Sequence, residues 1–251
     1  MSANVNSGVA KAKSRFVPVF VALMALSAAM VVAQFATKRE QWHPWEFMAL
    51  VLVGAVSSRL KVKLPGIDGN MSVNLPFIFI AMTQLSMGES LLVAAVSVVI
   101  QSVPKAPNKF VPIRAVFNTS TALLAAGLSW DVLRYGLDQR FGLEAALVLA
   151  CAAYLFVSTV PVAVVLSLAE GKEAFGTWSE ILHLSFPYYL ASTGLASIAV
   201  GLGGHAYWPT LAGVACVSFV MYRSYRTYFT AMRKELLTQS SPLVKAAAAA
   251  Q

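Results

Sequence analysis

The chain has 251 residues, of which 58% are hydrophobic and only 12% are charged, and its formal net charge is +8. In soluble domains roughly a quarter of the residues are charged, so this composition excludes an ordinary soluble protein built around one core. Residues 16–36 carry no charged side chain and reach the roughly 17 to 25 residues that cross a bilayer. We therefore predict an all-α fold, a polytopic helical bundle in a membrane.

Apolar runs bounded by charged residues, proline or glycine predict about eight membrane segments. The first run follows basic residues, as a signal peptide does, but charged residues follow it in place of a cleavage site, so we interpret it as a retained helix. The third and fourth runs are short. Tilt, local thinning of the bilayer or a re-entrant pair would accommodate them, which leaves six or seven full crossings as alternatives. In chain order the segments are residues 16–36, 44–60, 73–88, 89–103, 114–136, 143–169, 180–203 and 205–222.

Residues 60–75 interrupt the apolar pattern between the second and third segments. Asp68-Gly69 is a turn signal, and apolar residues alternate with polar ones on both sides of it. This period of two predicts a short β-hairpin at the inner membrane surface, with its apolar face against helices or lipid. The alternative is an irregular loop. The alternating apolar residues are Leu60, Val62, Leu64, Met71, Val73 and Leu75.

Polar side chains inside the apolar segments are the candidate functional residues, because such groups are costly in lipid unless they are paired or hydrated. Ser185 of the seventh segment is an expected partner for them. The alternative role is helix packing, in which hydroxyl groups bond to their own helix. The candidate intramembrane polar site, which would hold a small-molecule ligand, consists of Asn118, Thr121, Thr83, Gln84 and His183.

The end of the last segment carries an apolar repeat that continues past the membrane. Its members are spaced three, four, three and four residues apart, which is typical of a coiled-coil seam. We predict that one helix continues from the last crossing and pairs through this seam with a second copy or with a cytoplasmic signalling partner. A basic amphipathic helix on the inner leaflet is the alternative. The candidate association seam consists of Tyr222, Tyr225, Phe229, Met232 and Leu236.

Basic residues give the predicted bundle an orientation. With the N-terminus inside, Lys38, Arg39, Arg134 and Arg140 fall outside, and the other 15 of the 19 basic residues fall inside. Cytoplasmic loops show this bias, so we expect both termini in the cytoplasm of a bacterium, with the bundle in the inner membrane. Attraction to anionic lipid explains the positive charge without a nucleic-acid partner. The predicted regions are a tail at 1–15, a membrane domain at 16–222, and a cytoplasmic helix with a low-complexity tail at 223–251.

Motifs for catalysis are missing from the sequence. It contains no His-Glu-x-x-His zinc helix, no Gly-Lys-Ser/Thr phosphate loop and no Gly-x-Ser-x-Gly elbow. Cys151 and Cys216 each lie inside an apolar segment, where cysteine is ordinarily a small buried residue. We therefore expect a protein that is not an enzyme and that uses no cofactor and no metal.

Four short motifs, in this order, resemble a family of membrane modules. They are the turn-rich Leu64–Gly69, Met71-Ser-Val73, Phe117-Asn118, and the exit sequence Tyr222–Arg226. The arrangement resembles the integral-membrane N-terminal modules of bacterial signalling proteins that precede an HD-GYP or GGDEF output domain. Only residues 238–251 remain after the exit helix, so the resemblance does not imply turnover of a cyclic dinucleotide. It implies a non-enzymatic, stand-alone sensor or scaffold module of the inner membrane.

The alternative function is transport. Small membrane subunits that bind vitamins for uptake systems also carry Ala-x-x-x-Ala spacings in an early helix, as in Ala25, Ala29 and Ala33. The alternative is therefore a small-molecule transporter, or the substrate-binding membrane subunit of an uptake system.

Overall fold

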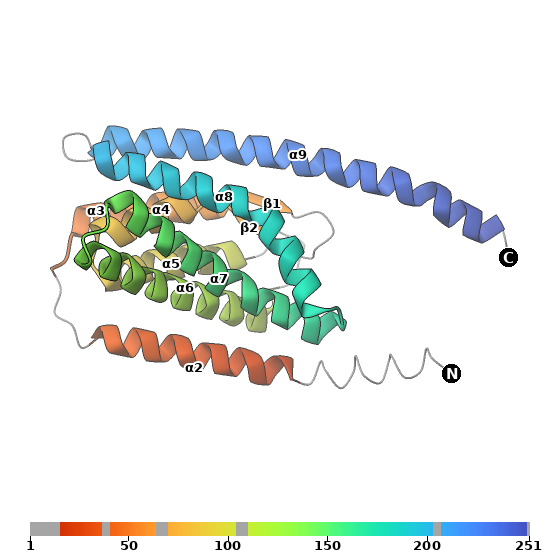
Figure 1. Ribbon diagram of the computed structural model, residues 1–251, viewed down its shortest axis with the longest axis horizontal. Helices are drawn as coiled ribbons and strands as arrows, with labels where there is room; N and C mark the ends of the chain where they lie inside the picture. Colours follow the sequence, from red (N-terminus) through yellow and green to blue (C-terminus); the bar gives the residue numbers. More distant parts are fainter. Residues whose placement is uncertain (1–15, 37–40, 64–69, 104–109, 203–206, 250–251) are drawn as a thin grey trace.

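The computed structural model describes residues 16–36, 41–63, 70–103, 110–202 and 207–249, with side chains in the last helix described up to Arg233. This part of the chain forms eight helices and one two-stranded sheet (Figure 1), which confirms the predicted all-α fold. The elements are α2 (Val17–Ala36), α3 (Pro44–Ser58), β1 (Lys61–Lys63), β2 (Asn70–Ser72), α4 (Leu75–Gln84), α5 (Met87–Ser102), α6 (Pro112–Asp138), α7 (Leu143–Glu170), α8 (Ala174–Leu202) and α9 (Tyr207–Ala249).

Two helices in the described residues are long and apolar enough to cross a membrane by length and composition. They are α2, over Val17–Gln34, and α7, over Leu143–Glu170. Helices α3, α4 and α5 are apolar but shorter. Helix α4 has 10 residues and rises only about 15 Å, roughly half of a hydrocarbon core.

The boundary between the third and fourth predicted segments was wrong. Helix α4 ends at Gln84 and α5 begins at Met87, so the break lies at residues 85–86. It was predicted between residues 88 and 89. The reason is a capping box: Ser86 accepts a hydrogen bond from the backbone N–H of Glu89, and the Glu89 carboxylate accepts one from the backbone N–H of Ser86. Such reciprocal bonds fix the start of a helix.

Helix α4 is the buried centre of the bundle. Every residue from Leu75 to Met82 is buried, so all faces of the helix are covered. A helix that is apolar on all sides is stable only when surrounded, and α3, α5, α6 and α8 pack around α4. The longer helices α6, α7 and α8 pack against each other in sequence and form the outer wall, while α2 lies along α6 (Figure 1).

Large apolar side chains cover much of the outside of the bundle. On α2, Leu23, Leu26 and Met30 are each about 60% exposed, and similar side chains lie on α3, α7, α8 and α9. Soluble monomers rarely expose apolar surface on this scale. The outward-facing surface therefore needs lipid or protein to cover it.

The two strands confirm the predicted hairpin. They pair antiparallel with Val62 opposite Met71, whereas the expected turn at Asp68-Gly69 lies outside the described residues. Val62 is buried against Phe229 of α9, with Leu184 of α8 packed beside them. The apolar face of the hairpin therefore rests on helices of its own chain rather than on lipid.

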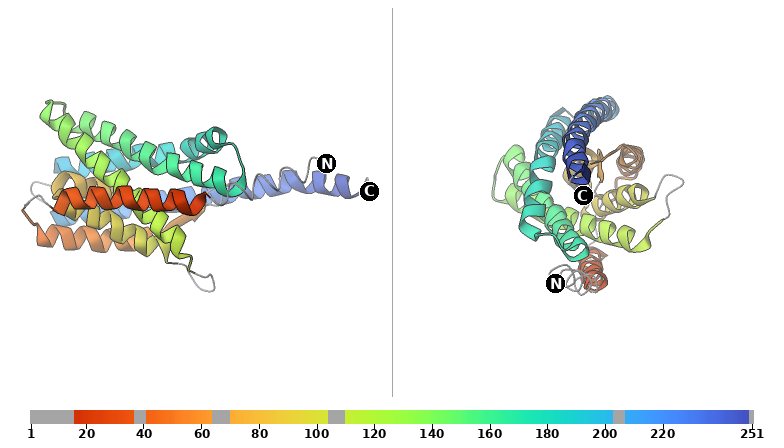
Figure 2. Two further views of the ribbon diagram at one scale, coloured as in Figure 1. Left: turned by 90° about the horizontal axis from the view of Figure 1, so that it is seen from below. Right: turned by 90° about the vertical axis from the view of Figure 1, so that its right-hand side faces the viewer.

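Helix α9 is continuous from Tyr207 to Ala249 and extends well beyond the other helices (Figure 2). This confirms the prediction that residues 222–236 continue the last segment as one helix. The helix also includes most of the alanine-rich tail, in keeping with the high helix propensity of alanine.

Replacing Gly127 of α6 by alanine should loosen helix α2. A Cβ atom at Gly127 would lie 2.6 Å from Cγ1 of Val31, so the Val31 side chain or the whole of α2 would have to move. We expect Gly127→Ala to lower the free energy of unfolding by about 1 to 3 kcal/mol in detergent, measured by denaturant titration.

The matched control is Gly213→Ala on α9, where an added Cβ meets nothing within 4 Å. It should be neutral or stabilise the helix by up to about 1 kcal/mol. Equal effects of the two substitutions would contradict the close packing of α2 on α6.

Candidate functional site

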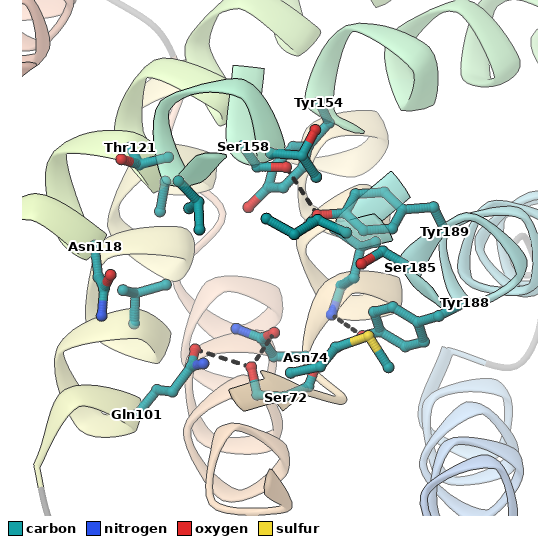
Figure 3. Close-up of a pocket in the computed structure, with 17 residues that line it drawn as sticks. Ser72, Asn74, Gln101, Asn118, Thr121, Tyr154, Ser158, Ser185, Tyr188 and Tyr189 are labelled. Carbon is teal, nitrogen blue, oxygen red and sulfur yellow. Dashed lines mark hydrogen bonds between the residues drawn. The ribbon is translucent and has the colours of Figure 1, made fainter. Parts of the chain in front are cut away.

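A cavity of about 210 Å³ lies where the hairpin and the first turn of α4 meet the long helices (Figure 3). Its lining comes from β2, α4, α5, α6, α7 and α8, so segments from across the chain converge on it. The polar lining consists of hydroxyl and carboxamide groups. The residues that carry them are Ser72, Asn74, Gln101, Asn118, Thr121, Tyr154, Ser158, Thr159, Ser185, Tyr188 and Tyr189.

One side of the cavity is a hydrogen-bonded group around the end of β2. The Ser72 hydroxyl lies 2.8 Å from Oδ1 of Asn74 and 2.9 Å from Oε1 of Gln101. A serine hydroxyl has one proton, so it can donate to only one of these two oxygens at a time. One carboxamide group therefore keeps the capacity to bond to something else.

The opposite side is formed by α7 and α8. The hydroxyl groups of Ser158 and Tyr189 lie 2.8 Å apart and can bond in either direction. Thr159 donates to the backbone oxygen of Leu155 over 2.6 Å and accepts from Nε1 of Trp178 over 3.1 Å. Figure 3 shows the Ser158–Tyr189 pair and the Ser72 group facing each other across the lining residues.

Tyr188 connects the cavity wall to the hairpin and to α9. Its hydroxyl donates to the backbone oxygen of Ser72 over 2.9 Å and accepts from the backbone N–H of Leu75 over 3.1 Å. The second bond satisfies one of the N–H groups that the start of a helix leaves without an internal partner. The ring of Tyr188 also packs edge to face on Tyr225 of α9, with ring centroids 6.3 Å apart.

The five residues of the candidate intramembrane polar site do not form one site. Asn118 and Thr121 both line the cavity, Asn118 exposed and Thr121 buried. Thr83 lies near the far end of α4 and donates to the backbone oxygen of Ile80 over 2.8 Å. Gln84 lines a separate, very small cavity near Tyr207.

His183 is exposed on α8, and its Nδ1 lies 2.8 Å from the backbone oxygen of Ser179 one turn earlier. Ser185, the expected partner, does line the cavity. The candidate polar site predicted from the sequence did not include Ser72, Gln101, Ser158 or Tyr188. For Tyr188 a signal was available, because two adjacent tyrosines follow a proline inside an apolar segment.

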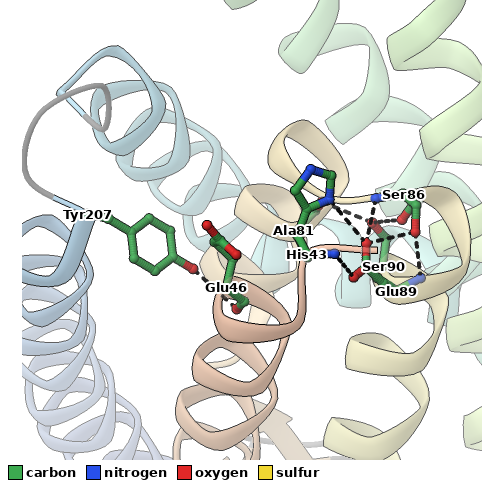
Figure 4. A network of polar contacts seen from close by, with 7 residues as sticks. All are labelled: His43, Glu46, Ala81, Ser86, Glu89, Ser90 and Tyr207. Atoms are coloured by element: carbon green, nitrogen blue, oxygen red, sulfur yellow. Dashed lines mark hydrogen bonds and ion pairs between the residues drawn. The ribbon is translucent and has the colours of Figure 1, made fainter. Parts of the chain in front are cut away.

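A second polar network lies around Glu89, whose carboxylate is fully buried (Figure 4). Its Oε1 accepts from the backbone N–H of His43 over 2.7 Å, and its Oε2 accepts from the Ser86 hydroxyl over 2.8 Å. Nearby, the Tyr207 hydroxyl donates to the backbone oxygen of Glu46 over 3.2 Å. These bonds tie the starts of α3, α5 and α9 together, so we interpret the network as structural.

The candidate association seam is partly occupied by the chain itself. Tyr222, Tyr225 and Phe229 pack around Val62 of the hairpin, and Phe229 is buried there. Met232 is half-buried, and the side chain of Leu236 lies outside the described residues. The first three seam residues therefore have partners without any second copy.

Metal ligation has no geometric support in the residues that the structure describes. Among them, no three His, Cys, Asp or Glu side chains come together as ligands. The lining of the cavity offers hydroxyl and amide oxygens in place of carboxylates, imidazoles or thiols.

Comparison with known proteins gives no relative from which a function can be transferred. No protein-family model matches the chain, and no curated protein and no solved structure matches it either. The resemblance to membrane modules of signalling proteins rests on the short motifs alone. Function therefore has to be argued from the cavity and its contacts.

Two threonines of the cavity should respond in opposite ways to replacement by valine. The Thr121 hydroxyl is buried with no hydrogen-bond partner among the described residues, so Thr121→Val should leave the free energy of unfolding unchanged or raise it by up to about 1 kcal/mol.

Thr159→Val, the matched comparison, leaves the Trp178 indole without its acceptor and should lower the free energy of unfolding by about 1 to 3 kcal/mol. Thermal unfolding in detergent would measure both. A loss of stability in Thr121→Val as large as in Thr159→Val would show that the Thr121 hydroxyl has a partner.

Proposed function

We propose that this chain is a non-enzymatic, multi-pass protein of a bacterial inner membrane that senses a small molecule in the cavity and passes the signal to helix α9. The observation that carries the proposal is the position of Tyr188. This one side chain lines the cavity, bonds to the hairpin and packs on α9.

The outer surface supports the membrane location. Apolar side chains on α2, α3, α7, α8 and α9 face outward, whereas most hydroxyl groups of the cavity lining belong to buried residues. Apolar surface is stable in contact with lipid, whereas polar groups are costly there unless they bond to each other. The short helix α4 does not have to cross the bilayer by itself, because other helices surround it.

The positions of the turns support the orientation. The turns between α4 and α5 and between α6 and α7 lie at one end of the bundle, and the hairpin and the α7–α8 turn lie at the other (Figures 1 and 2). The charge pattern assigns the first group to the outside and the second to the inside. Arg134 and Arg140 belong to the outer end, and Arg59, Lys61 and Lys172 belong to the cytoplasmic end.

Signal transfer follows from competition for hydrogen bonds. A molecule in the cavity that bonds to Ser72 or Gln101 alters the group that anchors β2, and Tyr188 holds the same strand. The other strand contacts α9 through Val62 and Phe229. A ligand with different affinity for two arrangements of the hairpin would shift their populations, which is the physical requirement for a sensor.

Transport remains the second candidate function, and the prolines beside the cavity favour it. Pro161 and Pro187 lie inside the continuous helices α7 and α8, beside the lining residues Val162 and Tyr188. Each proline removes one hydrogen bond of its helix and so frees a backbone carbonyl that could bond to a substrate. Flux of a bound compound across liposomes would favour transport over sensing.

The orientation gives the first test. In a chain with Cys151 and Cys216 replaced by alanine, Asp138→Cys should react with a membrane-impermeant maleimide added outside intact cells. Arg226→Cys should react only after the membrane is opened, because the charge pattern assigns it to the cytoplasm. Both positions are exposed at the ends of the bundle, so reactivity reports location. Labelling of Arg226→Cys from outside would overturn the orientation.

The sensing route gives the second test, which needs no ligand. Tyr188→Phe keeps the ring but removes the bonds to Ser72 and Leu75, so amide hydrogen exchange in 70–75 and in α9 around 222–233 should rise by roughly tenfold or more.

Tyr189→Phe is the matched control, because it removes only the bond to Ser158 on the opposite side. Its hydrogen exchange in 222–233 should equal that of the unmodified chain. If Tyr188→Phe changes exchange in 70–75 but leaves α9 untouched, the proposed route to the exit helix fails.

A further inference from the structure

The lining of the cavity defines a chemical class of ligand. Resting on the proposed function, we infer that the cavity binds a compact, uncharged molecule with an apolar ring or skeleton and with hydrogen-bonding groups, such as hydroxyl or carboxamide, that bond to one or both polar sides.

The absence of charge among the lining residues carries the first step. None of the 17 described residues that line the cavity is Asp, Glu, Lys, Arg or His. An ion transferred from water into this site would lose part of its hydration and meet no opposite charge among the described lining residues, which is unfavourable. Hydroxyl and carboxamide groups can instead replace the hydrogen bonds that an uncharged polar molecule makes with water.

The second step is the arrangement of polar groups on two sides. Ser72 faces two carboxamide oxygens with one proton, so the Asn74–Gln101 side has an unused bonding position. Across the cavity, Ser158 and Tyr189 share one hydrogen bond between two hydroxyls, each of which can both donate and accept. A ligand with polar groups at separated positions can bond to both sides at once.

The third step is the size and the apolar part of the lining. The lining also includes apolar side chains, those of Val98, Ala122, Val162 and Ile181, and the aromatic ring of Tyr154. The volume of about 210 Å³ is smaller than the roughly 300 to 1,000 Å³ of pockets for drug-sized ligands. A single ring with one or two small substituents suits this space, whereas a nucleotide or a lipid chain does not.

Three probes of nearly equal shape test the class. Benzamide is uncharged, benzoate is an anion and benzylamine is a cation at neutral pH. Binding to the full-length protein in detergent micelles would be measured by calorimetric titration. We expect benzamide to bind saturably. Benzoate and benzylamine should bind with an affinity at least roughly tenfold lower, because the described lining cannot compensate their charge.

Two blocked variants locate the binding. Val162→Phe and Val98→Phe each add a ring to the cavity lining from a different helix and should abolish benzamide binding. Val148→Phe is the matched control, because Val148 lies on α7 with its side chain 52% exposed on the outside of the bundle. It should bind benzamide as the unmodified chain does, and its unfolding temperature reports whether added bulk alone affects folding.

The outcomes separate this inference from the function on which it rests. Benzoate or benzylamine binding as tightly as benzamide, and lost in both blocked variants, would overturn the uncharged class while the cavity stayed a ligand site. Benzamide binding that survives both blocked variants, or saturable binding by none of the three probes, would also overturn the class. The sensing route is decided independently by hydrogen exchange in Tyr188→Phe, which requires no ligand.

Discussion

The structure depends on hydrogen-bond partners for the backbone N–H and C=O groups that lie outside helices in an apolar bundle. Between α3 and α4 the chain leaves the helical conformation, and its buried N–H and C=O groups need partners that regular helices do not provide. Pairing of β1 with β2 provides some of them, and the Tyr188 hydroxyl provides a donor for Ser72 and an acceptor for Leu75. Helix α4 can be short and apolar on every face because α8, which carries Tyr188, closes over it. The outer helices take their positions around this buried centre.

The same constraint explains where the cavity lies. Regular helices pack closely along their length, but a hairpin and a helix start present backbone groups and side chains of irregular shape. The polar residues that serve this junction, among them Ser72, Asn74 and Gln101, also line the cavity. The hairpin thus both lines the cavity and contacts the long helix α9. This sharing is the physical basis for proposing that occupancy of the cavity and the position of α9 are linked.

Sequence reasoning found the elements better than it found the site. Alternation revealed the hairpin, and the seam spacing revealed that α9 continues, because both patterns are local. The polar residues were grouped by segment, which gives no information on depth, so Thr83 and Gln84 were placed with Asn118 although they lie at the other end of α4. Glu89 was taken as part of a segment boundary, since only the fold shows that His43 comes back to its carboxylate. The role of Tyr188 depends on its hydrogen bond to Leu75, which lies 113 residues away along the chain, so no local pattern could reveal it.

That separation also affects the order in which the protein assembles. Helix α4 is synthesised long before α8, and the proposed membrane location would leave its length of about 15 Å too short to cross a bilayer alone. Until Tyr188 arrives, the N–H of Leu75 and the carbonyl of Ser72 lack the partner they have in the finished bundle. Folding therefore includes a late, long-range closure of α8 over α4, and the apolar helix α4 lacks this cover until α8 has been made.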